Sequence, residues 1–434
     1  IMINFRNRVY LFFWPEKLLR DYKINSIYLS LKGQSRKNGL FCRANFYLLL
    51  KISSTMVFSI VLFPINLFLY VTNYRFIYGT RFQQIGEIFL LDIAIKENKL
   101  NKNSKLILFY YPPFHDNSYL LSLYKKHVIF IDKTWLFPLL LPLSHSFLTR
   151  MDVVNLDTNC TNCKAADIFQ KYQLQYQKPL IKMQLKDVSE CENKISRRIQ
   201  GCKFVCVHAR EAGFNNGYYA DSERTTRNAD INTYDLLIDK LIELGYVVVR
   251  LGDPWMQSVL YLQEKYKENF VDYAHSDFRS EKMDVYLLSN CEFLVACSSG
   301  PSDVSNMFNI NTLLLNGYPA VNSLRFLEGD ISIFKKVVNI RTRKNIKFKK
   351  LFSKPFDLSL QHKDLKEIGY HLVDNSSNEM LNALGDFISI RKNTLEVNEK
   401  KSNMSKYFKK HHYGYNGSGK FSKSFIESYI DNSE

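Results

Sequence analysis

The chain has 434 residues, of which 46% are hydrophobic and 23% are charged, and this balance excludes a disordered protein. Its length predicts two domains with appended segments, and its formal net charge of +17 predicts an anionic partner. Much of the excess lies near the ends: residues 1–51 hold ten Lys/Arg against two acidic residues, and residues 391–410 hold seven against two.

The eight cysteines show no small-domain disulfide framework, which favours a reducing compartment. Cys160 and Cys163 have the spacing of half a zinc knuckle, but no second Cys or His pair follows at ligand spacing. We therefore expect no metal site and no cofactor.

Residues 52–71 are twenty uncharged residues within a basic N-terminal region, 1–72. A run of this length can cross a bilayer, lie in its interface, or form a buried hairpin of the first domain. Pro64 and Asn66 weaken the spanning interpretation. The basic flank predicts that the N-terminus stays on the cytoplasmic side, so we expect association with the cytoplasmic face of the membrane.

The elements expected next alternate between strands and helices. Strands are predicted at 74–79, 105–111 and 127–132. A glycine turn followed by an amphipathic helix is predicted at 84–98, a second helix at 118–126, and an apolar helical stretch with prolines at 135–148. This βαβαβ pattern predicts a first Rossmann-like lobe over 73–180. Residues 151–200 are interpreted as a domain linker with one helix near its end.

The second half repeats the pattern over 195–345. Strands are predicted at 203–209, 246–252, 270–274, 292–297 and 311–316. Helices are predicted at 233–244, with Asn232 as N-cap, and at 255–269, 281–290 and 302–308. Two doubly wound α/β lobes then face each other across a cleft between the carboxyl ends of their parallel sheets.

Polar residues follow the strands of the second lobe. His208 and Arg210 follow the first strand, Asp253 follows the second, and Ser298-Ser299-Gly300 follows the fourth. Gly300 and Pro301 begin a predicted helix, so its backbone N–H groups and positive dipole end form a cradle for an anion. Arg210 can grip a phosphate bidentately, and a structural salt bridge is the alternative.

These motifs carry a resemblance. The stretches "CVHAREAGF", "RNADINTYDLLIDKLIELGYVVVRLGDP" and "EFLVACSSGPS" are similar to a bacterial family of glycosyltransferases encoded among surface-polysaccharide genes, over roughly residues 73–345. The His-x-Arg after a strand also resembles fucosyltransferases of the NodZ and protein O-fucosyltransferase type. The resemblance implies a GT-B fold with a nucleotide-sugar on the C-terminal lobe. It makes Arg210 the diphosphate ligand, adds Ser298, Ser299 and Gly300 to the phosphate pocket, and places Asp253 near the ribose or base.

One motif departs from that family. Where its members often have Arg-Ile-Gly-His, this chain has Gln84-Ile85-Gly86-Glu87. Glu87 is a candidate general base for an acceptor hydroxyl, or else a cap for the helix it begins. His208 is the other candidate base, and its alternative role is to orient Arg210. No Asp-x-Asp follows a strand as a metal-dependent transferase requires, so catalysis without a metal ion is expected.

Arg227-Asn228-Ala229-Asp230 precedes the helix of the second lobe. Arg227 is a candidate ligand for the donor phosphates or sugar. Asp230 is a candidate for donor hydroxyls or for a helix cap. An Arg–Asp pair that braces the loop explains the motif nearly as well.

Residues 346–434 are interpreted as a C-terminal extension with a basic tail. Within it, "GYNGSGKFS" (414–422) imitates a phosphate loop, but Phe421 stands where Mg²⁺ binding needs Ser or Thr. Lys400, Lys401, Lys409 and Lys410 instead suggest contact with a membrane or an anionic carrier.

Three hypotheses follow for the function. The first is a membrane-associated glycosyltransferase that moves a sugar from a nucleotide-sugar to a lipid-linked or surface-polysaccharide acceptor. The second is a nucleotide-sugar epimerase of the same fold, against which the apolar segment 52–71 argues. The third is a non-catalytic scaffold for polysaccharide assembly or a nucleic-acid binder, and the expected lobes lack the basic, aromatic-rich face that nucleic acid requires.

Overall fold

The computed structural model describes residues 61–78, 84–101, 103–110, 117–132, 150–152, 165–199, 201–211, 225–392, 407–410 and 412–433. The predicted helical stretch at 135–148, all of residues 1–60, and Lys400 and Lys401 lie outside these ranges. Contacts divide the chain into two compact units. The domain boundaries expected from the sequence stay predictions.

The first unit holds helix α5 (Phe63–Val71) and strands β1 (Tyr74–Tyr78), β2 (Lys105–Phe109) and β4 (Arg150–Asp152). Strand β1 pairs in parallel with both β2 and β4. Among the described residues, no helix combines the length and the apolar character that crossing a bilayer demands.

The second unit is built on a seven-stranded sheet in the order β13-β10-β9-β8-β5-β6-β7, and all neighbouring strands in this order pair in parallel. Its strands are β5 (Phe204–His208), β6 (Val247–Arg250), β7 (Phe270–Asp272), β8 (Leu294–Ala296), β9 (Thr312–Gly317), β10 (Ile331–Phe334) and β13 (Lys420–Phe421). Counted from β5, the first six have the order 3-2-1-4-5-6 of a doubly wound nucleotide-binding sheet. The expected α/β class with parallel sheets is confirmed.

Helices cover both faces of this sheet. Alternate strand residues such as Val205, Val207 and Val295 are buried in one core with α11 (Asp235–Glu243), α16 (Ser377–Arg391) and α18 (Lys423–Asp431). Helices α13 (Glu281–Asn290) and α14 (Gly300–Met307) pack on the other face. The period-two burial follows from the pleat, since successive side chains point to opposite faces.

Most remaining elements lie close to their predicted places. They are the 3₁₀ turn η1 (Ile85–Glu87), α6 (Ile88–Asn101), α7 (Ser118–Ser122), η3 (Leu123–Lys126), β3 (Val128–Ile131), η5 (Thr225–Arg227), η6 (Ile231–Tyr234), and α12 (Leu260–Tyr266). Helix α12 starts five residues later than the predicted 255, because the Asp253 carboxylate accepts a hydrogen bond from the Trp255 N–H and holds a turn there.

The helix expected near the end of residues 151–200 is α10 (Leu185–Ile199), and the structure adds a second helix that was not predicted, α9 (Ala165–Tyr176). Helix α9 packs against α6 with Phe169 fully buried. Helix α6 differs from the prediction, because it is not amphipathic. Its Asp92 and Lys96 form a buried ion pair at 2.6 Å, and the Lys96 ammonium lies 4.2 Å from the centroid of the Phe169 ring.

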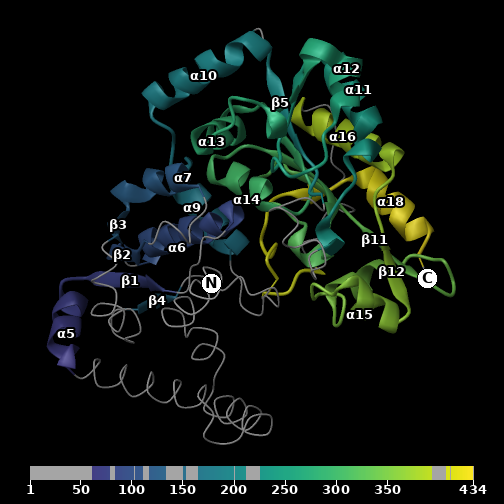
Figure 1. Cartoon of the computed structure of the whole chain (residues 1–434). Helices are drawn as coiled ribbons and strands as arrows, with labels where there is room; N and C mark the ends of the chain where they lie inside the picture. Colours follow the sequence, from purple (N-terminus) through teal and green to yellow (C-terminus); the bar gives the residue numbers. More distant parts are fainter. Residues whose placement is uncertain are drawn as a thin grey trace, which may run out of the picture. The chain divides into compact units, whose positions relative to one another are not determined.

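The expected basic tail also differs, because residues 412–433 are part of the core of the second unit. Strand β13 pairs with β10 at the sheet edge, and α18 lies beside α16 (Figure 1). The glycines of the phosphate-loop imitation serve close packing: a Cβ on Gly417 or Gly419 would come within 2.8 Å of the Arg325 carbonyl oxygen.

Phe425 tests this assignment. Its ring is buried and stacks edge-on against Phe334, with 4.9 Å between centroids. Phe425→Ala should lower the free energy of unfolding by about 3–5 kcal/mol, measured by urea unfolding. The matched control is Ile430→Ala on the same helix, where Ile430 is 52% exposed and the change should stay within about 0.5 kcal/mol. Equal effects of the two variants would contradict a buried α18.

Candidate active site

Strands β5 and β8 are neighbours at the centre of the sheet, and the chain leaves them in opposite directions, toward β6 and toward β9. Such a switch point leaves room for a ligand beyond the carboxyl ends of the strands. His208 pairs in register with Ala296, and the Arg210 N–H donates to the Cys297 sulfur at 3.2 Å. The segments carrying Arg210 and Ser298 therefore leave the sheet side by side.

A backbone contact between two glycines brings η1 onto the start of α14. A Cβ on Gly86 would lie 2.6 Å from the Gly300 Cα, and a Cβ on Gly300 would lie 2.9 Å from the Gly86 nitrogen. No side chain fits at either position. The glycine turn and the serine-glycine turn, which the sequence analysis assigns to different lobes, thus meet at the switch point.

Buried groups brace this contact from behind. The ring of Phe89, in the first turn of α6, lies 5.4 Å from that of Phe326, which lies 5.2 Å from that of Tyr413. The Asp303 carboxylate of α14 accepts hydrogen bonds from the Tyr413 hydroxyl at 3.0 Å and from Arg325 at 3.1 Å. Burial raises the pKa of Asp303, against the opposing charges of Arg325 and Arg227. These groups fix the position of the helix start.

The two predicted serine ligands have partners within the protein. The Ser298 hydroxyl accepts a hydrogen bond from the Tyr318 N–H at 3.1 Å, and the Ser299 hydroxyl donates to the Cys297 carbonyl at 3.0 Å. Ser298 thus keeps its own O–H for an acceptor outside the loop, whereas Ser299 has used its proton. Of the two, only Ser298 has a hydroxyl proton available to a phosphate oxygen.

The two predicted arginines approach the same end of α14. Arg210 follows β5 and is 5% exposed, and its carbonyl accepts a hydrogen bond from the Ala229 N–H at 2.8 Å. Arg227 ends η5 and is half-buried, with its charge close enough to act on the pKa of Asp303. The structure therefore brings Arg210, Arg227 and the α14 start toward one region.

His208 is buried and electrically neutral at physiological pH. Its Nδ1 lies 3.1 Å from the Leu251 carbonyl oxygen, so that nitrogen carries the proton and donates. Burial lowers the pKa of His208 to about 4, and the charges of Arg250 and Arg210 act in the same direction. A neutral imidazole fixed by the backbone suits a positioning role beside Arg210.

Glu87 ends η1 and is half-buried. Its Oε2 accepts a hydrogen bond from the Gln84 N–H at 3.3 Å, which closes a capping box around the 3₁₀ turn. The capping interpretation of Glu87 is therefore confirmed, for η1 rather than for α6. A role as base stays a prediction, and its position next to Gly86 places it beside the α14 start.

Two predicted acids hold turns. The Asp230 carboxylate accepts from the Asn232 N–H at 2.9 Å and caps η6, and the Asp253 carboxylate accepts from the Trp255 N–H at 3.0 Å. Asn232, the expected N-cap, lies inside η6 instead, because the chain begins its first turn one residue after Asp230. Binding of donor hydroxyls by either acid stays a prediction.

Sequence reasoning missed several buried charged groups at this edge of the sheet. Arg250 pairs with Asp272 at 3.0 Å and with Glu211 at 2.9 Å, and is 1% exposed. Lys335 follows β10 and donates hydrogen bonds to the Asn228 carbonyl and to the Asp374 carboxylate. The bond to Asn228 anchors the segment that carries Arg227. An arginine at the end of the buried strand "YVVVR" could have indicated the ion pairs of Arg250. Nothing in the local sequence indicates that Asp374 pairs with Lys335.

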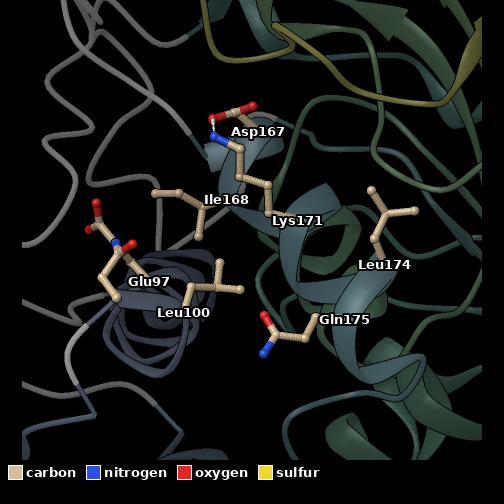
Figure 2. A pocket seen from close by; sticks show the side chains of 8 residues that line it. Glu97, Leu100, Asp167, Ile168, Lys171, Leu174 and Gln175 are labelled. Carbon is tan, nitrogen blue, oxygen red and sulfur yellow. Dashed lines mark hydrogen bonds and ion pairs between the residues drawn. The ribbon is translucent and has the colours of Figure 1, made fainter.

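A groove of about 590 Å³ lies elsewhere on the second unit, between the end of α6 and α9 (Figure 2). Glu97, Leu100, Ile168 and Lys171 are among its lining residues, and none of the predicted site residues is. Ten residues of helix separate Glu87 from Glu97, a distance of about 15 Å. The groove is therefore distinct from the switch point.

No family model and no curated protein matches the chain. Solved structures with some likeness include a glycosyltransferase of family 9 from Veillonella parvula, at 12% identity over 56% of this chain and 81% of that one, with a TM-score of 0.34. A second is E. coli ADP-heptose LPS heptosyltransferase II, at 11% identity over 74% of this chain and 99% of that one, with a TM-score of 0.37. A third is E. coli heptosyltransferase WaaC with an ADP-heptose analogue, at 10% identity over 56% of this chain and 89% of that one, with a TM-score of 0.32. TM-scores below 0.5 decide neither the fold nor the activity of this chain.

The glycine contact gives a test by substitution. Gly86→Ala forces its Cβ to within 2.6 Å of backbone, so the free energy of unfolding should fall by about 1–3 kcal/mol. The control is Gly385→Ala in α16, where a Cβ meets nothing within 4 Å and stability should hold or rise by up to about 1 kcal/mol. Urea unfolding measures both. An unchanged stability in Gly86→Ala would show that the two turns do not touch.

His208 predicts a pH dependence of stability. Its pKa falls from 6.5 to about 4 on folding, so between these values the unfolded chain binds more protons and the folded state loses stability as pH falls. Lowering the pH from 7 to 5 should remove about 2 kcal/mol through this group. His208→Asn should abolish this part of the pH-dependent loss of stability, whereas His371→Asn, at an exposed position, should leave it unchanged. Denaturant titrations of both variants at pH 7 and pH 5 measure the difference. An identical pH dependence in the two variants would contradict a buried neutral imidazole.

Proposed function

We propose that the protein is a glycosyltransferase that moves a sugar from a nucleotide-sugar to an acceptor hydroxyl. The observation that carries this proposal is the meeting of the Gly86 turn with the α14 start at the switch point of a doubly wound sheet. A switch point with arginines and a helix start suits the pyrophosphate of a nucleotide. A glycine turn carrying a carboxylate beside it supplies a base for a second substrate.

The donor would be held through its diphosphate. Arg210 and Arg227 would pair with the phosphate oxygens, and the Ser298 hydroxyl and the Gly300 N–H would donate hydrogen bonds to them. Asp253 follows β6 and Asp230 lies between η5 and η6, and carboxylates at these positions would suit ribose and sugar hydroxyls. Resemblance to the surface-polysaccharide transferases supports the same assignment, and with it a GT-B arrangement of two lobes.

The reaction would follow from these positions. Glu87 takes the proton of the acceptor hydroxyl, and the resulting oxygen attacks the anomeric carbon of the donor sugar. The bond between that carbon and the phosphate oxygen breaks, and its electron pair leaves with the nucleoside diphosphate. Arg210 and the α14 start stabilise the charge that develops on the leaving group. Catalysis through these protein groups, without a metal ion, stays part of the proposal.

Glu87 is a better base than His208 in this arrangement. His208 is 5% exposed, its Nδ1 is committed to the Leu251 carbonyl, and two arginine charges oppose its protonation. Glu87 is half-buried and carries its carboxylate next to the glycine contact. We assign the proton transfer to Glu87 and the orientation of Arg210 to His208.

The acceptor would be a lipid-linked or surface-polysaccharide glycan at the cytoplasmic face of the membrane. Support comes from α5, whose Phe63, Phe68 and Val71 are 51%, 65% and 73% exposed. Apolar side chains exposed on one short helix suit insertion into a bilayer interface. The Arg75 guanidinium lies 4.6 Å from the centroid of the Tyr70 ring, as expected of residues at the level of the headgroups.

One paired experiment separates binding from chemistry. Arg210→Ala and Arg210→Lys should weaken binding of a nucleoside diphosphate by about tenfold or more, through loss of charge-assisted hydrogen bonds. Glu87→Gln keeps an acceptor for the Gln84 N–H, so binding should hold while sugar transfer falls by about 10²–10⁴-fold. Calorimetry with UDP, GDP, ADP and CMP and a donor-hydrolysis screen with purified membranes measure the two effects.

The control is Arg197→Ala at an exposed position of α10, which should change neither quantity. Failure of every nucleotide to bind the unmodified protein would overturn the transferase assignment. Full transfer activity in Glu87→Gln would leave the donor site standing and remove Glu87 as the base.

A further inference from the structure

A strongly basic turn lies outside the proposed active site. Residues 331–356 contain nine Lys/Arg and no Asp or Glu. Six of these cations are exposed between strand β11 (Lys336–Asn339) and the end of the 3₁₀ helix η10 (Phe348–Phe352). They are Arg341, Arg343, Lys344, Lys347, Lys349 and Lys350. We call this set the basic turn.

The backbone of the basic turn is fixed by hydrogen bonds. The Asn339 carboxamide oxygen accepts from the N–H groups of Arg341 and Thr342, at 2.9 and 3.0 Å. The Ile346 N–H donates to the Val337 carbonyl at 2.8 Å, and Ile346 is fully buried. Because the backbone is already ordered, gathering the cations needs little further loss of entropy.

Two more cations lie beside this turn. The ring of Phe348 lies 5.6 Å from that of Tyr407, and the ring of Phe352 lies 5.0 Å from that of Phe408. These contacts seat residues 407–410 on η10, so the exposed Lys409 and Lys410 extend the basic turn. From the sequence alone these lysines suggest contact with a membrane or an anionic carrier, and in the structure they lie beside a larger basic surface.

The basic turn differs from the cations just before it. Lys335 and Lys336 pair with Asp374 and Glu379. Within the described ranges, none of the six cations of the basic turn, nor Lys409 or Lys410, has an acidic partner within 4.0 Å.

We propose that the basic turn is a docking surface for the anionic headgroups of phospholipids. Eight exposed cations on one ordered turn and its neighbour match the polybasic clusters that anionic membrane surfaces attract, with about 1 kcal/mol from each. The exposed cations are spread over residues 341–350 and 409–410, which suits an extended charged surface better than a small anion.

Nucleic acid fits this surface less well. Single strands bind by stacking bases on exposed aromatic rings, and the aromatic rings at this turn are turned inward: Phe348, Phe352 and Phe408 are 7%, 2% and 5% exposed. Headgroup binding needs only charge. The lipid assignment therefore accounts for both the exposed cations and the buried rings.

Vesicle co-sedimentation of the full chain tests the proposal without donor or acceptor, so its outcome is independent of transferase activity. Vesicles of phosphatidylcholine with about 30% phosphatidylglycerol should bind the protein more tightly than pure phosphatidylcholine. The triple variant Lys347→Gln, Lys349→Gln, Lys350→Gln should weaken binding to the anionic vesicles about a hundredfold, at fivefold for each cation. Binding to the neutral vesicles, which would report on α5 and the apolar segment, should not change.

The matched control removes the same charge elsewhere, at the exposed Lys182, Lys186 and Lys267. An equal loss of vesicle binding in this control would overturn the proposal, since total charge alone would then explain the binding. So would a basic-turn variant that binds anionic vesicles normally, or duplex DNA and single-stranded RNA that bind as tightly as the vesicles and compete with them. Urea unfolding of both triple variants checks that they fold.

Discussion

The contact between the backbones of Gly86 and Gly300 is the constraint on which the proposed site depends. Because neither residue has a side chain, the turn that carries Glu87 comes within van der Waals distance of the start of α14. That helix start lies at the switch point, one strand away from the segment that carries Arg210. The turn that carries Glu87 and the start of α14 are thereby brought together by two residues without side chains.

Buried charges at the strand ends have partners that keep them in place. Arg250 is held by Asp272 and Glu211, and Arg325 by Asp303. Each pair must offset the large cost of removing charges from water, which it does through short contacts and further hydrogen bonds. Arg250 is thus a structural cation, although it stands at a strand end as Arg210 does, and charge alone does not distinguish a ligand-binding arginine from a bracing one.

The strands of the second unit were predictable because β-branched runs such as "YVVVR" bounded by turn residues have few other interpretations. What the sequence did not reveal depends on contacts between distant segments. Asp92 and Lys96 look like the polar face of α6, and only the packing of Phe169 shows that they are buried together. Likewise the glycines near residue 417 have the spacing of a phosphate loop, and only the structure shows that the Arg325 carbonyl packs against them.

The C-terminal segment shows how far this dependence reaches. Tyr413 donates to Asp303 in the first turn of α14 and packs its ring against Phe326, which in turn packs against Phe89 just after the Gly86 turn. Tyr413 therefore supports both sides of the glycine contact, although it lies more than 100 positions from Asp303 and from Phe89 along the chain. The site at the switch point is consequently a product of distant parts of the second unit, since Tyr413, in the segment that precedes β13, helps to fix the start of α14.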